Sequence, residues 1–315
     1  MNILVVPTIR EDCIKEFLAA WKGVAGYDRI IVVEDNPTKT FQIEGCDHFS
    51  WQEINDDLGE DAWIISRRDA AIKCYGFLAA YRAGADYIFV LDDDCYPDLR
   101  HDFFKRHVEI IETTPRWATS MPNQRTRGLP YRNLGKLNVV LNVGLWMGVP
   151  DLDAPHALHS PDIQDFQPPA GSHVLPKNQY VPLCGMNMCM KREFCCLSYF
   201  PIMGEKVGYR RFDDIWFGVI AKKICDHLDL SIACGEPFIH HKKASNVFAN
   251  LAKEAAGIGL NETFWEVIDG IVLESKTPIS CMQEIGVCLT AMEHRYYQTL
   301  GKAITAWAGI FQSMT

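Results

Sequence analysis

Residues 87–97 read Tyr-Ile-Phe-Val-Leu-Asp-Asp-Asp-Cys-Tyr-Pro. The five residues before the first aspartate are apolar, β-branched or aromatic, which predicts a strand buried on both faces. Ligands of open parallel sheets bind outside the carboxyl ends of the strands, so we expect the three carboxylates at the mouth of a crevice. A turn that merely ends the strand is the alternative interpretation. The strongly apolar strand before the triplet favours a site.

The acidic triplet has the spacing of a divalent-metal site. Asp92 and Asp94 are two residues apart and lie on the same side of an extended chain. Carboxylate oxygens so placed suit Mg²⁺ or Mn²⁺ that also carries a diphosphate, because these ions take one or two protein carboxylates and further oxygens from phosphate and water. His241 follows a short predicted strand and is our candidate for a third ligand, although a lone histidine is more often packed. Lys243 beside it suits a phosphate.

The first hundred residues alternate between predicted strands and helices. Strands are expected at 2–6, 29–33 and 62–66, before the strand at 87–91, and helices at 11–21 and 70–81. Gly84 ends the second helix. This alternation is typical of a doubly wound α/β sheet.

Polar side chains follow each of these predicted strands and fall at one edge of the sheet. Carboxylates there can accept hydrogen bonds from ribose hydroxyls and arginines can bind diphosphate oxygens, which indicates a nucleotide. Glycine fingerprints are missing after the first strand, and no Gly-x-x-x-x-Gly-Lys occurs, so we expect no flavin, no nicotinamide and no P-loop. The expected nucleotide-binding residues are Pro7, Thr8, Arg10, Glu34, Arg68, Asp69, Asp93 and Lys243.

The second half of the chain is less regular. Residues 115–180 are rich in Pro, Arg, Asn and Gly and are expected to form lids or substrate loops; their arginines 125, 127 and 132 fit a site or a solvated basic face. The turn 150–155 is expected to be structural. Strand character returns at 181–190. Asp213 and Asp214 open a helix that runs to about His227, where they are either caps or acids of the site. Beyond residue 250 the chain is expected to be helical, so we divide it into a catalytic domain, 1–250, and a helical extension, 251–315, that packs on it or mediates assembly.

Composition favours a cytoplasmic enzyme with a small partner. The formal charge of −9 over 315 residues gives no general attraction to nucleic acid. Twelve cysteines without a Cys-x-x-Cys pair or a signal peptide are typical of reduced thiols and argue against structural zinc. No apolar run is long enough to cross a bilayer.

Taken together, these motifs resemble the reversibly glycosylated polypeptide family, which includes plant UDP-arabinopyranose mutases. The likeness extends over most of the chain. It includes Val6-Pro-Thr-Ile-Arg10, Asn36-Pro-Thr-Lys-Thr40, Asp92-Asp-Asp-Cys95, Gly144-Leu-Trp146, Pro150-Asp-Leu-Asp-Ala-Pro155, Cys184-Gly-Met-Asn187, Phe212-Asp-Asp-Ile-Trp216, Ile224-Cys-Asp-His-Leu228 and Lys243-Ala-Ser-Asn246.

The resemblance implies a GT-A-like, Rossmann-like sheet that binds a nucleotide sugar, with a divalent metal at the Asp-x-Asp motif. It also implies reversible attachment of the sugar to an arginine that corresponds to Arg127, with Asp213 or Asp214 as the acid that assists it. UDP-arabinose is the substrate that it favours.

Two departures from the family pattern keep other functions open. Leu134 stands where the family has a second arginine, and Glu34 stands where it has an aspartate. One alternative is a glycosyltransferase that passes the sugar to a separate acceptor. The other is a weakly active subunit that assembles, as a homo- or hetero-oligomer, with active homologues through its C-terminal helices.

Overall fold

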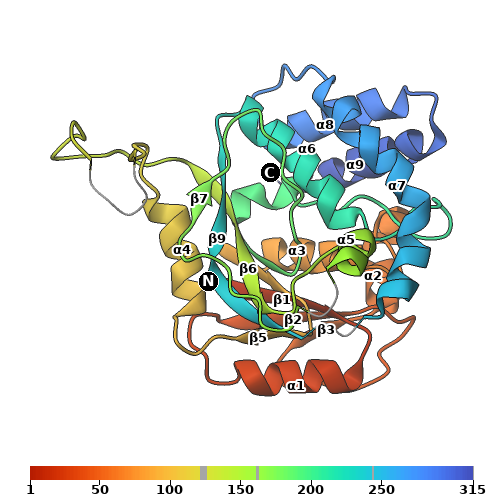
Figure 1. The fold of residues 1–315 in the computed structure, drawn as a ribbon. Coiled ribbons are helices and arrows are strands. Elements are labelled where there is room, and N and C mark those ends of the chain that lie inside the picture. Colours follow the sequence, from red (N-terminus) through yellow and green to blue (C-terminus); the bar gives the residue numbers. More distant parts are fainter. Residues whose placement is uncertain (121–125, 161–162, 243–244, 315) are drawn as a thin grey trace.

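A mixed β-sheet forms the centre of the molecule (Figure 1). The computed structural model describes residues 1–120, 126–160, 163–242 and 245–314. Over these residues the sheet has nine strands in the order β3-β2-β1-β4-β8-β6-β9-β5, with β7 paired to β9. The strands are β1 (Asn2–Thr8), β2 (Arg29–Glu34), β3 (Asp47–Phe49), β4 (Tyr87–Leu91), β5 (Cys95–Pro97), β6 (Val139–Gly148), β7 (His173–Val174), β8 (Asn187–Lys191) and β9 (Ser231–His241).

Strands β3, β2, β1 and β4 are parallel, and β8 runs antiparallel between β4 and β6. The register pairs Thr8 with Glu34 and Val5 with Val90, so β1, β2 and β4 end at the same level. Their carboxyl ends therefore meet at one edge, where the polar residues were expected. This arrangement confirms the predicted α/β, GT-A-like class.

Helices cover both faces of the sheet because the strand residues alternate in direction. Leu4 and Val6 pack against α1 and α4 on one face, and Ile3 and Val5 face α3 and α6 on the other. The helical segments are α1 (Glu11–Trp21), α2 (Trp51–Leu58), η1 (Gly59–Ile64), η2 (Ala70–Ile72), α3 (Lys73–Arg82), α4 (Phe103–Thr113), α5 (Ala154–His159), η3 (Arg192–Leu197), α6 (Asp213–His227), α7 (Val247–Asp269), α8 (Pro278–Thr290) and α9 (Arg295–Gln312).

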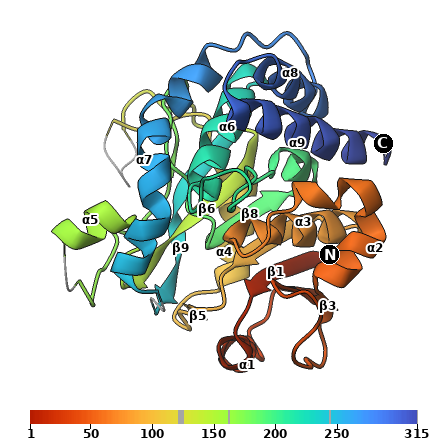
Figure 2. The ribbon, with the colours of Figure 1, turned by 90° about the vertical axis from the view of Figure 1, so that its right-hand side faces the viewer.

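The C-terminal helices α7, α8 and α9 gather over α6 (Figure 2). Their buried residues, among them Phe264, Ile285 and Trp307, belong to the same hydrophobic cluster as Val5 and Val90 of the sheet. The C-terminal helices therefore pack on the sheet layer. No helix of the described chain is long and apolar enough to span a bilayer.

Two local predictions were wrong. Residues 62–66 were expected to form a strand, but Gly59–Ile64 is a 3₁₀-helix and the short third parallel strand is Asp47–Phe49. Ala62, Ile64 and Ile65 are buried by packing beside the sheet, and a short apolar run does not distinguish the two structures. The middle of the chain, expected to be irregular, contains the ten-residue strand β6. Its residues are buried almost throughout, so it lacks the alternation that would have revealed it.

Candidate active site

A pocket of about 280 Å³ lies at the carboxyl ends of β1 and β4, bordered by α5, α6 and α7. Acidic and basic side chains line most of it. The acids are Asp69, Asp92, Asp94, Asp151, Asp213 and Asp214, and the basic residues are Arg10, Arg68, Arg210, Arg211, His241 and Lys253. The fold thus brings together eight of the residues predicted from the sequence, and it adds others from loops that the sequence analysis did not assign to a site.

Asp93 is the buried member of the acidic triplet and organises the residues around it. It accepts a hydrogen bond of 2.6 Å from the Thr8 hydroxyl and forms an ion pair with Arg10. Arg10 Nη2 also lies 3.9 Å from Asp94. Thr8 and Asp93 do not line the pocket themselves; they hold the Arg10 guanidinium at its edge, where it can meet an anionic ligand.

Lys73, in the first turn of α3, fixes the position of Asp92. Its Nζ is buried and donates to Asp92 Oδ1 at 2.6 Å and to the Gly185 carbonyl at 2.9 Å. Burial lowers the pKa of Lys73, but the charge and hydrogen bond of Asp92 outweigh it and the net pKa is raised. The sequence analysis missed Lys73. The available signal was a lysine that interrupts the apolar start of the helix following Asp69.

His241 and Asp94 face each other across the pocket. His241 Nδ1 lies 2.7 Å from the Val149 carbonyl and therefore carries a proton, which leaves the lone pair of Nε2 on the side of Asp94, 3.9 Å away. Burial, followed by the charge of Asp92, raises the pKa of Asp94 to about 6. A carboxylate with a raised pKa beside an imidazole nitrogen fits a site that gains a cation when it is filled.

Asp213 and Asp214 begin α6 and point into the same region. Asp214 accepts hydrogen bonds of 2.9 Å from the backbone N–H groups of Gly185 and Ile215. Burial, then the charge of Asp151, raises its pKa to about 6. Asp213 is buried, and among the described residues its Oδ2 has no hydrogen-bond partner. Burial, then the charge of Asp69, raises the pKa of Asp213 well above its usual range, so it favours the protonated form.

Over the described residues, the one cluster of three potential metal ligands that lie close together is in the pocket wall, and it does not include Asp92, Asp94 or His241. The ligand atoms of Asp151, Cys184 and Asp214 all lie within 4.8 Å of one another, which makes a metal site possible on geometry. The Cys184 thiol, however, donates to Asp151 Oδ2 at 2.8 Å, and burial raises its pKa well above the usual value. A protonated thiol is a poor ligand for the hard cations that carry diphosphates.

Asp151 corrects the expectation that the whole turn 150–155 is structural. Asp153 is structural: it caps α5 by accepting from the His156 N–H at 2.9 Å. Asp151 instead lines the pocket. Chain topology brings it there, because β6 delivers it to the same edge of the sheet as β9 delivers His241.

Besides Thr8 and Asp93, two further predicted nucleotide-binding residues, Glu34 and Pro7, do not line the pocket. Glu34 is fully buried and accepts from the Asn36 amide at 2.8 Å and the Thr40 N–H at 2.9 Å, while its other oxygen lies 2.9 Å from His48 Nε2. Its carboxylate thus holds the loop after β2. Pro7 belongs to β1 and does not line the pocket, and Lys243 lies outside the described residues.

Arg127 is exposed and does not line the pocket. It belongs to an arm between α4 and β6, whose described residues, 115–120 and 126–137, project from the body (Figure 1). The arm is anchored at the amino end of β6, where Pro115 pairs with Lys136. Arg132 is also exposed on this arm, and Arg125 lies outside the described residues.

Arg211 and Glu254 hold the pocket wall together. Glu254 of α7 is buried, accepts from Arg211 Nε at 2.7 Å, and accepts from the Ala154 N–H at the start of α5, also at 2.7 Å. Arg211 has a φ of 65°, and its guanidinium lines the pocket. Local sequence gave no signal for this contact, because its partners are 43 and 100 residues from Glu254.

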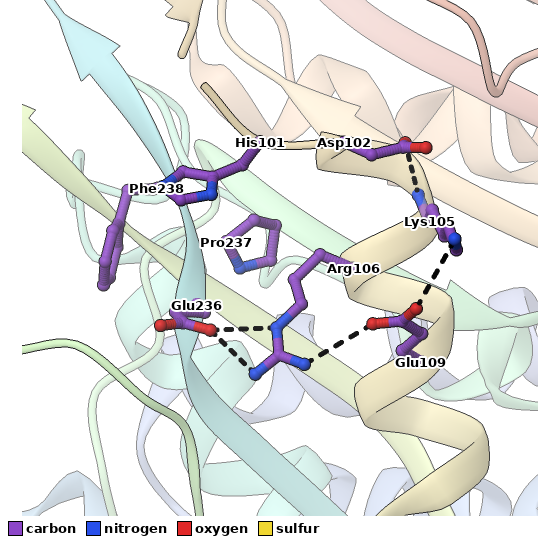
Figure 3. A pocket seen from close by; sticks show the side chains of 8 residues that line it. All are labelled: His101, Asp102, Lys105, Arg106, Glu109, Glu236, Pro237 and Phe238. Atoms are coloured by element: carbon purple, nitrogen blue, oxygen red, sulfur yellow. Dashed lines mark hydrogen bonds and ion pairs between the residues drawn. The ribbon is translucent and has the colours of Figure 1, made fainter. Parts of the chain in front are cut away.

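A second hollow, of about 190 Å³, lies between α4 and β9 (Figure 3). Its principal charges already neutralise one another. Arg106 pairs with Glu236 at 2.7 Å and with Glu109 at 3.5 Å, and Glu236 also accepts from the Gly171 N–H. This hollow therefore offers no free charge that calls for a ligand, unlike the acidic pocket.

Several known proteins are similar to this chain. The profile of the family "Reversibly glycosylated polypeptide" matches residues 2–315. "Probable UDP-arabinopyranose mutase 4" of Arabidopsis thaliana is 31% identical over 99% of this chain and 90% of its own length. "UDP-arabinopyranose mutase 1" of Oryza sativa subsp. japonica is 32% identical over 95% of this chain and 84% of its own length. A solved mycobacterial protein superposes with a TM-score of 0.41 at 14% identity, covering 81% of this chain and 75% of that one.

Proposed function

The chain belongs to the reversibly glycosylated polypeptide family, and from this membership together with the acidic pocket we propose that it is a UDP-arabinopyranose mutase. The observation that carries the proposal is the pocket itself, where Asp92, Asp94 and His241 meet arginines at the carboxyl edge of a nucleotide-binding type of sheet. UDP-arabinose is the proposed substrate, and the cytoplasm is the proposed location.

We propose Asp92, Asp94 and His241 as the residues that would hold Mn²⁺ or Mg²⁺. Their donor set is two hard oxygens and a neutral imidazole nitrogen, and the Val149 carbonyl orients that imidazole. Such an ion would act as a Lewis acid toward the departing diphosphate. Arg10 and Arg68 would bind the diphosphate oxygens, and Lys73 would keep Asp92 in place.

The proposed reaction passes the sugar reversibly to Arg127. The bond between the anomeric carbon and the diphosphate breaks with its electron pair on the diphosphate oxygen, and a guanidinium nitrogen bonds to that carbon. The nitrogen must lose a proton, and Asp214, whose pKa of about 6 leaves it mostly ionised at neutral pH, can accept it. Protonated Asp213 can donate a hydrogen bond to a sugar oxygen. While the sugar is held on nitrogen, the bond between the anomeric carbon and the ring oxygen O5 breaks, O4 bonds to that carbon, and the proton of the O4 hydroxyl passes to O5. Return of this sugar to UDP, with the nitrogen regaining its proton, gives the furanose form.

The position of Arg127 implies that a second copy supplies it. β6 has ten residues, so its anchored amino end and the pocket at its carboxyl end are about 30 Å apart. Arg127 precedes the anchor at Lys136 by nine residues, which span about 30 Å only when fully extended. An arm with exposed Arg127 and Arg132 also complements the acidic pocket in charge. We therefore propose a homo-oligomer in which the arm of one copy enters the pocket of the next.

Labelled UDP-arabinopyranose tests both parts of the proposal. The wild type should gain a pentose-sized mass on Arg127 and release the furanose isomer, and Arg132→Lys should still be labelled. A mixture of an Arg127→Lys copy with an Asp92→Asn, Asp94→Asn copy should label the second copy, although neither is labelled alone. An unlabelled wild type would refute the acceptor role of Arg127. A labelled wild type with an unlabelled mixture would refute only its delivery by a second copy.

Leu134 favours a second candidate function, transfer of the sugar to a separate acceptor, because the family has an arginine at that position. The same incubation distinguishes the two functions. A mutase yields the isomeric UDP-sugar without any acceptor, whereas a transferase releases UDP slowly and yields no isomer.

A further inference from the structure

A groove of about 1080 Å³ adjoins the acidic pocket. Its walls are η1, the loop after it, residues 202–210 and the start of α9. Arg68 and Arg210 line both the groove and the pocket, so the two cavities are neighbours with a shared wall. Apart from Arg68 on the shared wall, no residue that lines the groove has a part in the proposed mutase reaction.

The charge of the groove is opposite to that of the whole chain. Five of its lining residues are cationic, and Glu205, which pairs with Arg210 at 3.0 Å, is its single carboxylate. Over the described part of the chain, the other four cations have no carboxylate within 4.0 Å; they are Arg67, Arg68, Lys206 and Arg295. Such a concentration of unpaired positive charge in a protein of net charge −9 creates a local field that attracts anions. The hollow of Figure 3 is different, because its cations are paired.

Arg67 is the least satisfied of these cations. Its guanidinium lies over the Trp51 ring, 5.5 Å from the ring centre, and its Nη2 donates to Asn55 at 2.9 Å. Nη1 is buried, and none of the described residues accepts a hydrogen bond from it. Burial also lowers the pKa of Arg67 from its usual value, and the charge of Asp35 offsets that effect only in part. An anion in the groove would compensate this cost.

The groove is too large and too apolar in part for a simple inorganic anion. Trp63 is 44% exposed on its rim, and half-buried Tyr209 lines it as well, backed by the buried ring of Tyr296. Flat aromatic surfaces between charged groups suit a chain of sugar rings that carries acidic substituents. We propose that the groove binds an anionic saccharide, with carboxylate or phosphate groups, whose end lies beside the acidic pocket at Arg68 and Arg210.

Calorimetry on the full chain, with saturating UDP and Mn²⁺ to fill the pocket, tests this proposal. The probes are trigalacturonate, a phosphorylated mannan oligosaccharide and neutral maltotriose. At least one anionic probe should bind, more tightly than maltotriose and less tightly as salt rises from about 50 to about 200 mM. Whichever anionic probe binds better identifies the acidic group.

The variant that tests the groove removes the charge of two exposed cations that line it. Lys206→Gln with Arg295→Gln should weaken binding of the anionic probe about tenfold. Lys22→Gln with Lys276→Gln makes the same change in charge on exposed residues outside the groove lining and should leave the affinity unaltered. Absence of binding, equal affinity for the neutral probe, or equal loss in both variants would overturn the proposal.

Discussion

Lys73 is a buried cation, and its removal should destabilise the protein because Asp92 loses its partner. Lys73→Met keeps most of the volume but leaves the inner oxygen of Asp92 without its 2.6 Å partner. Because Asp92 is 30% exposed, we expect a loss of about 2 kcal/mol in the free energy of unfolding, less than for a fully buried pair. Urea denaturation measures it. In an Asp92→Asn background the loss should be clearly smaller; an equal loss in both backgrounds would show that the two residues are not coupled.

Asp69 should make the free energy of unfolding depend on pH. Burial, with the charge of Asp35 as a smaller cause, raises its pKa to about 6. The pKa of Asp69 is near 4 in the unfolded chain and about 6 in the folded protein, so between these pH values the folded state binds more protons than the unfolded state. The contribution of Asp69 to the free energy of unfolding is therefore present below about pH 4 and is lost as the pH rises to about 6. Asp69→Asn retains a capping side chain and removes the titration. Relative to the wild type without metal, it should gain about 1–2 kcal/mol from pH 4 to pH 7. A difference in unfolding free energy that does not change with pH would contradict this assignment.

At the scale of elements, Glu254 ties α5 and α7 to the loop before α6. Glu254→Ala leaves the Arg211 guanidinium and the Ala154 N–H without their partner, which should cost about 3 kcal/mol of unfolding free energy. Because Arg211 lines the pocket, the stabilisation of the protein by UDP and Mn²⁺ should also shrink. Thermal unfolding with and without ligand measures both effects. Glu262→Ala on an exposed part of α7 is the control and should change neither; an unchanged ligand response in Glu254→Ala would remove the contact from the binding site.

At the scale of the molecule, Trp307 connects the C-terminal helices to the sheet layer. It is fully buried, and its Nε1 donates to the Cys196 carbonyl at 2.9 Å. Trp307→Ala should cost about 3–5 kcal/mol. Because the hydrophobic cluster is continuous from α9 to the sheet, unfolding should remain a single transition by fluorescence and by circular dichroism. Two separate transitions would show that residues 251–315 unfold as an independent domain.

Local pattern was sufficient for three of the four strands in the parallel half of the sheet and for the acidic strand end, but not for β3. The apolar runs of β1, β2 and β4 and the helical spacing of α1 and α3 depend on residues close together in sequence. Since parallel strands end at one edge, the order of strands and helices along the chain was enough to place the polar residues after them in one cleft. The acids of α6 and His241 after β9 followed from the same reasoning.

Tertiary structure alone decided the rest, because those contacts join residues whose separation in sequence carries no pattern. The parallel pairing of β6 with β9 brings Asp151 and His241 to one pocket. Packing of α3 under the acidic strand end turns Lys73 into the partner of Asp92, and the Thr40 loop and His48 enclose Glu34 instead of leaving it free for a ligand. The sequence by itself determined which acidic, basic and hydroxyl side chains lie at the ends of the strands. Only the folded chain decided which of those groups face the pocket, which of them instead hold other residues in place, and that Arg127 is exposed and outside the pocket lining.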